Sequence, residues 1–143
     1  MATLLVHIRV RPGGEARFEE LARRLYADSH ANERDVRRYE YWRGAEPGTY
    51  YTLESFDEYG GFLTHQTSPH HEQAGPELRE VIEEIRLEWV DPLGAASPLT
   101  PTDMSELPAG ASDLERDYHQ RYAATVQSWW LPLRALEGDP GPG

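Results

Sequence analysis

The order of periodic segments along the first ninety residues is the feature that most restricts the fold. Four segments show the alternation or the aromatic and β-branched content typical of strands, and two show the spacing of amphipathic helices. The predicted strands are 3–10, 35–43, 49–57 and 85–91, and the predicted helical regions are 15–31 and 57–83. The order β-α-β-β-α-β predicts an α+β, ferredoxin-like fold, in which two helices cover one face of a four-stranded antiparallel sheet.

The second face of the predicted sheet carries apolar residues as well. Leu5, Tyr51 and Leu53 occupy strand positions that point away from the helices. In a monomer they would form a large exposed apolar patch, and such patches usually mark an interface. We therefore predict a homodimer that packs sheet against sheet and forms a dimeric α+β barrel, with His7 facing the same interface.

The composition changes after Leu93. Residues 94–111 are rich in Pro, Ala, Ser and Thr, which is typical of a linker. Ser112 or Asp113 can then cap a helix with an apolar stripe, which Pro132 would stop before a Gly/Pro tail. We predict a domain at 1–93, a linker at 94–111 and a C-terminal amphipathic helix with its tail at 112–143. This helix either folds back on its own dimer or binds a separate partner.

Charge and composition exclude several classes of function. The chain has 25 acidic and 14 basic residues and a net charge of -11, which disfavours nucleic acid and anionic membranes as partners. It has no cysteine, so disulfides, thiolate metal sites and cysteine nucleophiles are excluded. Neither a signal peptide nor an apolar stretch of about 20 residues is visible, and we expect a cytoplasmic protein.

The densest group of reactive side chains lies at the break in the second helical region. It contains His65, His70, His71 and Glu72. Imidazole can act as a general base near neutral pH or bind a metal, but these spacings match no strong zinc or iron signature, so we predict no metal. For His65 and His70 a catalytic and a structural role both stay open, whereas we assign His71 a structural role at the start of a helix.

Glu54 is the second candidate group. It lies on the third predicted strand and shares a face with Tyr50, Thr52 and Phe56. A carboxylate among aromatic residues is costly to bury without a partner. Glu54 is therefore either a paired structural acid or part of a pocket. No glycine-rich loop of a nucleotide or flavin site is present, so we predict no cofactor.

With these residues in place, the segment 4–93 resembles the antibiotic biosynthesis monooxygenase family, a family of dimeric α+β barrels that includes quinol monooxygenases. The resemblance rests on four short motifs in the right order: Arg11-Pro12-Gly13, Tyr39-Glu40-Tyr41-Trp42-Arg43, Glu54-Ser55-Phe56, and His65 and His70 after Phe62. It implies a monooxygenase that oxidises a quinol, polyphenol or polyketide-type aromatic with dioxygen and without flavin, haem or metal.

The resemblance also implies a set of site residues. Thr52, Glu54, Phe56, Phe62, His65 and His70 would line a pocket between sheet and helices. His65 or His70 would be the catalytic base, and Arg79 would stabilise an anionic oxygen.

The chain departs from two branches of the family. Anthrone oxygenases carry Asn, Trp and Tyr at the positions of Thr52, Phe56 and Phe62, and haem-degrading members carry their functional residues at the positions of Val6, Phe56 and Gly75.

The alternative to an enzyme is a non-catalytic small-molecule-binding or stress-response barrel whose C-terminal helix mediates assembly.

Overall fold

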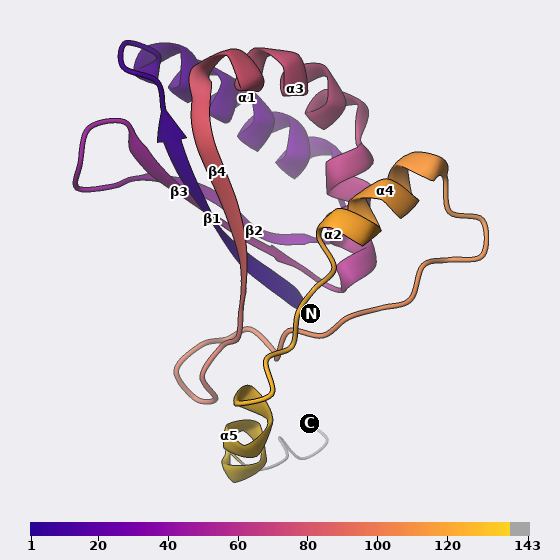
Figure 1. The fold of residues 1–143 in the computed structure, drawn as a ribbon. Helices are drawn as coiled ribbons and strands as arrows, with labels where there is room; N and C mark the ends of the chain where they lie inside the picture. Colours follow the sequence, from indigo (N-terminus) through magenta and orange to yellow (C-terminus); the bar gives the residue numbers. More distant parts are fainter. Residues whose placement is uncertain (138–143) are drawn as a thin grey trace.

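The predicted order of strands and helices is confirmed. The computed structural model describes residues 1–137, and its first ninety residues form a four-stranded sheet with helices on one face (Figure 1). The elements are β1 (Ala2–Val10), α1 (Glu15–Asn32), β2 (Val36–Arg43), β3 (Thr49–Phe56), α2 (Tyr59–Thr67), α3 (Pro69–Val81) and β4 (Ile82–Val90). This is the α+β, ferredoxin-like arrangement that the sequence predicts.

The sheet is antiparallel with the strand order β2-β3-β1-β4. Its register places Val6 beside Thr52 on one side and beside Leu87 on the other. Leu4, Val6 and Ile8 are at most 6% exposed, because they point toward the helices. The inner face of the sheet therefore consists of every second residue of each strand.

The helices bury the stripe that their spacing predicts. Phe18, Leu21, Ala22 and Leu25 of α1 are all buried. Together with the inner face of the sheet they form most of the hydrophobic core.

The break in the second helical region lies between α2 and α3. Ser68 caps α3, its Oγ accepting a hydrogen bond from the backbone N–H of His71 at 3.3 Å, and Pro69 occupies the first position, where a missing N–H costs nothing. Asp57 does not cap α2. The Asp57 carboxylate pairs with Arg37 instead, at 2.5 Å between Oδ1 and Nε, and α2 begins after Glu58.

The outer face of the sheet is not covered by a helix of the ninety-residue unit. Leu5, Tyr51 and Leu53 are partly exposed there, and Trp42 is 58% exposed. His7 also lies on this face, and its Nε2 is 2.8 Å from Glu88 Oε2. The dimer expected at this face stays a prediction.

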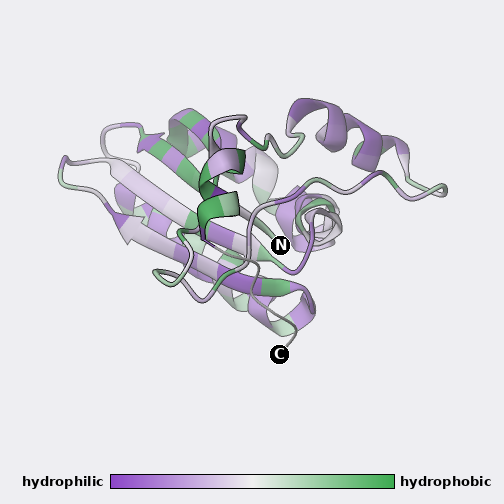
Figure 2. Ribbon diagram, turned by 90° about the horizontal axis from the view of Figure 1, so that it is seen from below, coloured by the Kyte–Doolittle hydropathy of each residue, from purple (hydrophilic) through white to green (hydrophobic). Residues whose placement is uncertain are grey.

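The C-terminal segment differs from the single helix that the sequence predicts. Residues 91–112 form neither helix nor strand, and two helices follow: α4 (Asp113–Arg121) and α5 (Trp130–Leu136). α4 is hydrophilic along nearly its whole length, whereas α5 is rich in hydrophobic residues (Figure 2).

The apolar stripe that the sequence predicts for this segment is thus divided between α4 and α5. The backbone leaves the helical conformation at Tyr122, the C-cap of α4. Pro132 does not stop a helix but stands in the first turn of α5, where a proline is tolerated. The expected Gly/Pro tail falls largely on residues 138–143, outside the described residues.

Candidate active site

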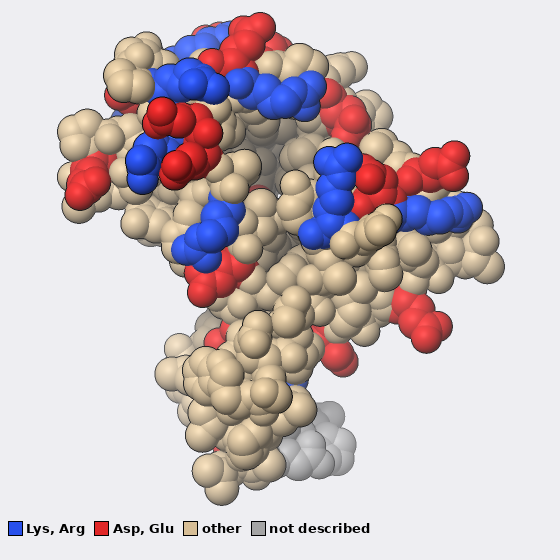
Figure 3. All heavy atoms as spheres, in the orientation of Figure 1, with Lys and Arg blue, Asp and Glu red and all other residues tan. Residues whose placement is uncertain are grey.

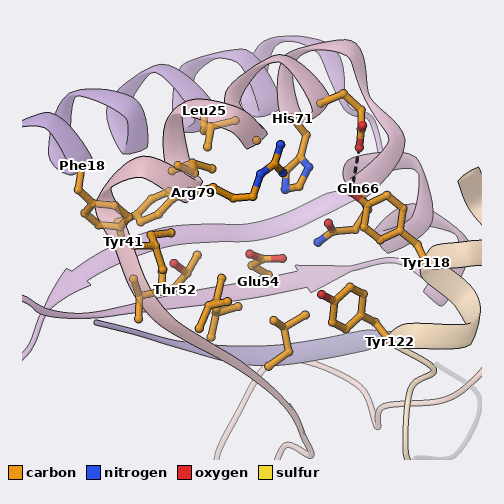
Figure 4. Close-up of a pocket in the computed structure, with 18 of the residues that line it drawn as sticks. Phe18, Leu25, Tyr41, Thr52, Glu54, Gln66, His71, Arg79, Tyr118 and Tyr122 are labelled. Carbon is orange, nitrogen blue, oxygen red and sulfur yellow. Dashed lines mark hydrogen bonds between the residues drawn. The ribbon is translucent and has the colours of Figure 1, made fainter. Parts of the chain in front are cut away.

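A cavity of about 740 Å³ lies between the inner face of the sheet and helices α1 and α3. Phe18 and Tyr41 lie at one end of it, residues of α4 and its C-cap lie at the other, and Glu54 and His71 lie between (Figure 4). On the molecular surface this region is hollowed, with acidic and basic side chains around the hollow (Figure 3). The volume and the largely apolar lining are typical of a small-molecule site.

Three polar side-chain atoms of cavity residues are buried and have no hydrogen-bond partner within residues 1–137. They are Thr52 Oγ1, Glu54 Oε2 and His71 Nδ1. A buried polar atom without a partner costs about 1–3 kcal/mol, so native proteins keep few of them. All three residues line the same cavity, so a ligand bound there is the partner we expect for these atoms.

Glu54 supplies a carboxyl group to the sheet side of the cavity. It lies opposite Leu4 of β1 and Tyr39 of β2, and it is 6% exposed. Burial raises the pKa of this carboxyl, while the positive charge of His65 works against that rise. Because Oε2 has no partner within the described residues, the structure favours the pocket acid over the paired acid.

Two tyrosines of β2 line the cavity next to Glu54 and Thr52. The hydroxyl oxygens of Tyr39 and Tyr41 are 2.6 Å apart, and burial raises the pKa of both phenols. Both side chains therefore stay neutral hydrogen-bond donors. In the sequence they stood out only as parts of a family motif, although their register with Glu54 and Thr52 places them on the same face of the sheet.

Helix α3 brings a second group of side chains to the cavity, spaced one helical turn apart. His71, Gly75 and Arg79 all line it. Burial, with a further contribution from the charge of His65, lowers the pKa of His71 to about 3, so its imidazole is neutral. The Arg79 side chain points into the cavity toward His71 (Figure 4). The purely structural role expected for His71 does not account for its unpartnered Nδ1.

His65 and His70 do not line this cavity but contact Glu33 behind it. His65 Nδ1 is 3.0 Å from Glu33 Oε2, and His70 Nε2 is 2.6 Å from Glu33 Oε1. Burial lowers the pKa of His65, but the Glu33 hydrogen bond and the charges of Glu54 and Glu33 outweigh it and raise the pKa overall. Burial alone would raise the pKa of Glu33, but its hydrogen bonds to His65 and His70 outweigh burial, and the pKa of Glu33 is lowered overall. We call these three residues the Glu33 cluster.

The Glu33 cluster contacts the cavity through His65. The rings of His65 and His71 meet edge to face, with centroids 5.0 Å apart. His65, whose pKa is raised, therefore lies directly behind the neutral imidazole that lines the cavity.

Phe56 and Phe62 also differ from the predicted arrangement. Both are 0% exposed, their rings contact each other, and neither lines the cavity. Of the seven predicted site residues, the structure thus brings Thr52, Glu54 and Arg79 together at the cavity. It places the other four in the core and in the Glu33 cluster.

Three cavity residues lie beyond the predicted domain. Tyr118, Arg121 and Tyr122 come from α4 and its C-cap, and no sequence motif identified them. No group of three or more histidine and acidic side chains within residues 1–137 is arranged to hold a metal ion. Every helix in the same range is too short or too polar to cross a lipid bilayer.

A family model described as antibiotic biosynthesis monooxygenase matches residues 1–76. This match covers β1 to β3, α2 and the first part of α3, and so includes Thr52, Glu54 and His71. No curated protein matches the chain.

Solved structures of bacterial proteins that bear the same family name share the fold. A protein of Caulobacter crescentus CB15 is 24% identical, with a TM-score of 0.61 over 64% of this chain and 88% of its own. A protein of Bacteriodes thetaiotaomicron VPI-5482 is 16% identical, with a TM-score of 0.61 over 73% of this chain and 95% of its own. A protein of Nitrosomonas europaea is 17% identical, with a TM-score of 0.61 over 65% of this chain and 99% of its own. These relatives are covered almost completely, whereas a quarter or more of this chain extends beyond each match.

Proposed function

Since the chain belongs to the antibiotic biosynthesis monooxygenase family, we propose that it oxidises a quinol, polyphenol or polyketide-type aromatic with dioxygen and without flavin, haem or metal. The observation that carries this proposal is that three residues lining one largely apolar cavity, Thr52, Glu54 and His71, each have a buried polar atom without a partner in residues 1–137. Such a cavity binds an aromatic ring through its apolar walls and phenolic oxygens through its polar atoms.

Glu54 is the group we propose as the base. A carboxylate with a raised pKa is a stronger base toward a phenol, and burial raises the pKa of Glu54. Its Oε2 has no partner in the described residues, so it is available to accept the phenolic proton. The resulting phenolate is a much better electron donor than the phenol.

His71 and Arg79 face Glu54 from the helix side of the cavity. The neutral imidazole of His71 can hydrogen-bond a second substrate oxygen, and the Arg79 guanidinium attracts the negative charge that forms when the proton leaves. In this proposal the proton acceptor lies on the sheet and the stabilising cation lies on α3, with the substrate ring between them.

The electrons of the reaction come from the substrate. The phenolate passes an electron to dioxygen, and the two radicals then combine into a hydroperoxide. Loss of water from the hydroperoxide leaves one oxygen atom in the product as a carbonyl, and the other leaves as water with two hydrogen atoms of the substrate. No external reductant enters this balance, so the protein has to bind, deprotonate and shield the substrate.

His65 and His70 remain candidates in a different role from the one predicted. Because both contact Glu33 and neither lines the cavity, we propose that they position His71 rather than accept the substrate proton. We also propose that the outer face of the sheet, with Leu5, Tyr51 and Leu53, forms the homodimer interface.

Oxygen uptake tests the proposal. The purified chain, treated with a chelator, is mixed with a panel of hydroquinones and polycyclic phenols, and uptake above the buffer rate is expected for at least one of them. Glu54→Gln keeps the shape of the side chain and should lower that rate by about 10²-fold or more. Glu84→Gln, an exposed residue of β4 outside this cavity, is the matched control and should leave the rate unchanged.

Two results would contradict the proposal. Uptake at the buffer rate across the whole panel would favour the non-catalytic binding barrel, which would use the same cavity without the electron transfer. Uptake that Glu54→Gln leaves unchanged would remove Glu54 from the mechanism.

A further inference from the structure

Residues that the family match does not include contribute to the end of the cavity farthest from Phe18. The match ends at residue 76, and Tyr118, Arg121 and Tyr122 lie beyond it. The solved relatives are themselves covered to 88% or more, so this segment is an addition to the unit they share with the chain. An added segment that reaches the cavity is in a position to alter which ligands fit.

Two hydrogen bonds hold this segment against the ninety-residue unit. The Tyr118 hydroxyl donates to Glu72 Oε1 of α3 at 2.8 Å, shown as the dashed line in Figure 4. The Tyr59 hydroxyl of α2 donates to the backbone oxygen of Tyr122 at 3.1 Å. The segment is therefore fixed to both helices that border this end of the cavity.

The two nearly parallel tyrosine rings give this end of the cavity an aromatic surface. Their centroids are 6.0 Å apart and the planes are inclined by only 25°. Both rings lie at the cavity end opposite Phe18 and Tyr41, with Glu54 between the two ends (Figure 4). A ligand that places a phenolic oxygen at Glu54 must be long enough to reach this surface before it can stack on it.

We infer that Tyr118 and Tyr122 are specificity-determining residues that select planar ligands of several fused rings over single-ring phenols. The inference rests on the proposed function only in taking a phenolic aromatic as the ligand. Tyr118 and Tyr122 need not touch the reacting oxygen, because they act on the far end of the ring system.

Binding without turnover tests this inference separately from the proposed chemistry. The probes are 1,8-dihydroxyanthraquinone, which is already oxidised, and phenol, and calorimetry measures both affinities. The wild-type chain should prefer the anthraquinone. In Tyr118→Ala/Tyr122→Ala the affinity for the anthraquinone should fall about 10-fold, while that for phenol changes less than about twofold.

Two further variants separate stacking from loss of the fold. Tyr118→Phe keeps the ring and removes the hydrogen bond to Glu72, and it should keep the preference for the anthraquinone. Tyr26→Ala changes an exposed tyrosine of α1 outside this cavity and should bind as the wild type does. Circular dichroism at the titration temperature confirms that each variant is folded.

The inference is overturned if Tyr118→Ala/Tyr122→Ala binds both probes more weakly by the same factor. It is also overturned if Tyr118→Phe loses the preference as fully as the double variant, or if the wild type binds neither probe. Selective binding without oxygen uptake would contradict the proposed function and support the inference. Oxygen uptake without a difference in affinity between the two probes would support the proposed function and contradict the inference.

Discussion

The Glu33 cluster allows a quantitative prediction, because all its members are largely buried. The side chains of Glu33, His65 and His70 are 5%, 1% and 14% exposed. Removing one partner of a buried ion pair costs about 3–5 kcal/mol. Glutamine at position 33 can still accept an imidazole hydrogen bond, and a histidine can release its proton, so we expect the low end, about 3 kcal/mol for Glu33→Gln near pH 6.

The pH dependence of this loss follows from two opposite shifts. The pKa of His65 is raised above its ordinary 6.5, so its stabilisation is complete below 6.5 and is lost as the pH rises through the raised value. The pKa of Glu33 is lowered below its ordinary 4.5, so its stabilisation is present above 4.5 and is lost as the pH falls through the lowered value. The difference between wild type and variant is therefore greatest between 4.5 and 6.5 and shrinks at higher pH.

Urea unfolding followed by tryptophan fluorescence measures the difference at about pH 6 and at about pH 9. A loss of about 3 kcal/mol corresponds to a fall of about 10 °C in melting temperature for a chain of this size. Glu20→Gln is the matched control, because Glu20 pairs with Arg17 on the same helix but is 69% exposed; we expect no measurable change. An equal loss in both variants, or a loss that does not shrink at the higher pH, would refute the reasoning.

Four other changes have defined outcomes. Thr52→Val replaces an unpartnered buried hydroxyl with a methyl group, so it should raise the free energy of unfolding by about 1 kcal/mol in urea titrations and weaken phenol binding in calorimetry. Leu53→Arg puts a charge on the outer face of the sheet and should turn the proposed dimer into a monomer in light scattering. Ser68→Ala removes the N-cap of α3 and should cost about 1 kcal/mol in thermal unfolding. Arg134→Met breaks the pair with Asp91 that holds α5, and limited proteolysis should then cut within residues 91–112 faster than in the wild type.

The strands were predictable from the sequence to a level that helped locate the site. Alternation along a strand fixes which residues share a face, so the sequence alone assigns Thr52 and Glu54 to the same face of β3. The same rule applied to β2 would have added Tyr39 and Tyr41. What the alternation could not show was that Glu54 Oε2 has no partner within residues 1–137, because that depends on side chains from the other elements around the cavity.

The helices were less informative about the site, because the break between α2 and α3 changes which residues of the second helical region face the cavity. His65 and His70 are five residues apart in the sequence, but Ser68 ends α2 and starts α3 between them. The new helix turns His71, Gly75 and Arg79 toward the cavity, whereas His70 turns toward Glu33. Glu33 itself was not a candidate, because it lies just past the end of α1 and meets the histidines only in the folded chain.

The position of Tyr118 and Tyr122 at the cavity could not be predicted from the family segment, which ends at residue 76. The i, i+4 spacing of Tyr118 and Tyr122 predicted one long apolar stripe, which the structure divides between α4 and α5, and the path of residues 91–112 decides which surface the two tyrosines cover. That path is fixed by contacts distant in sequence: Thr102 Oγ1 donates to the backbone oxygen of Val90, and the backbone N–H of Asp103 donates to the backbone oxygen of Met1. Because the proposed proton acceptor Glu54 lies inside the family segment and the Tyr118 and Tyr122 surface lies outside it, we expect relatives that share only this segment to share the proposed chemistry without sharing the ligand.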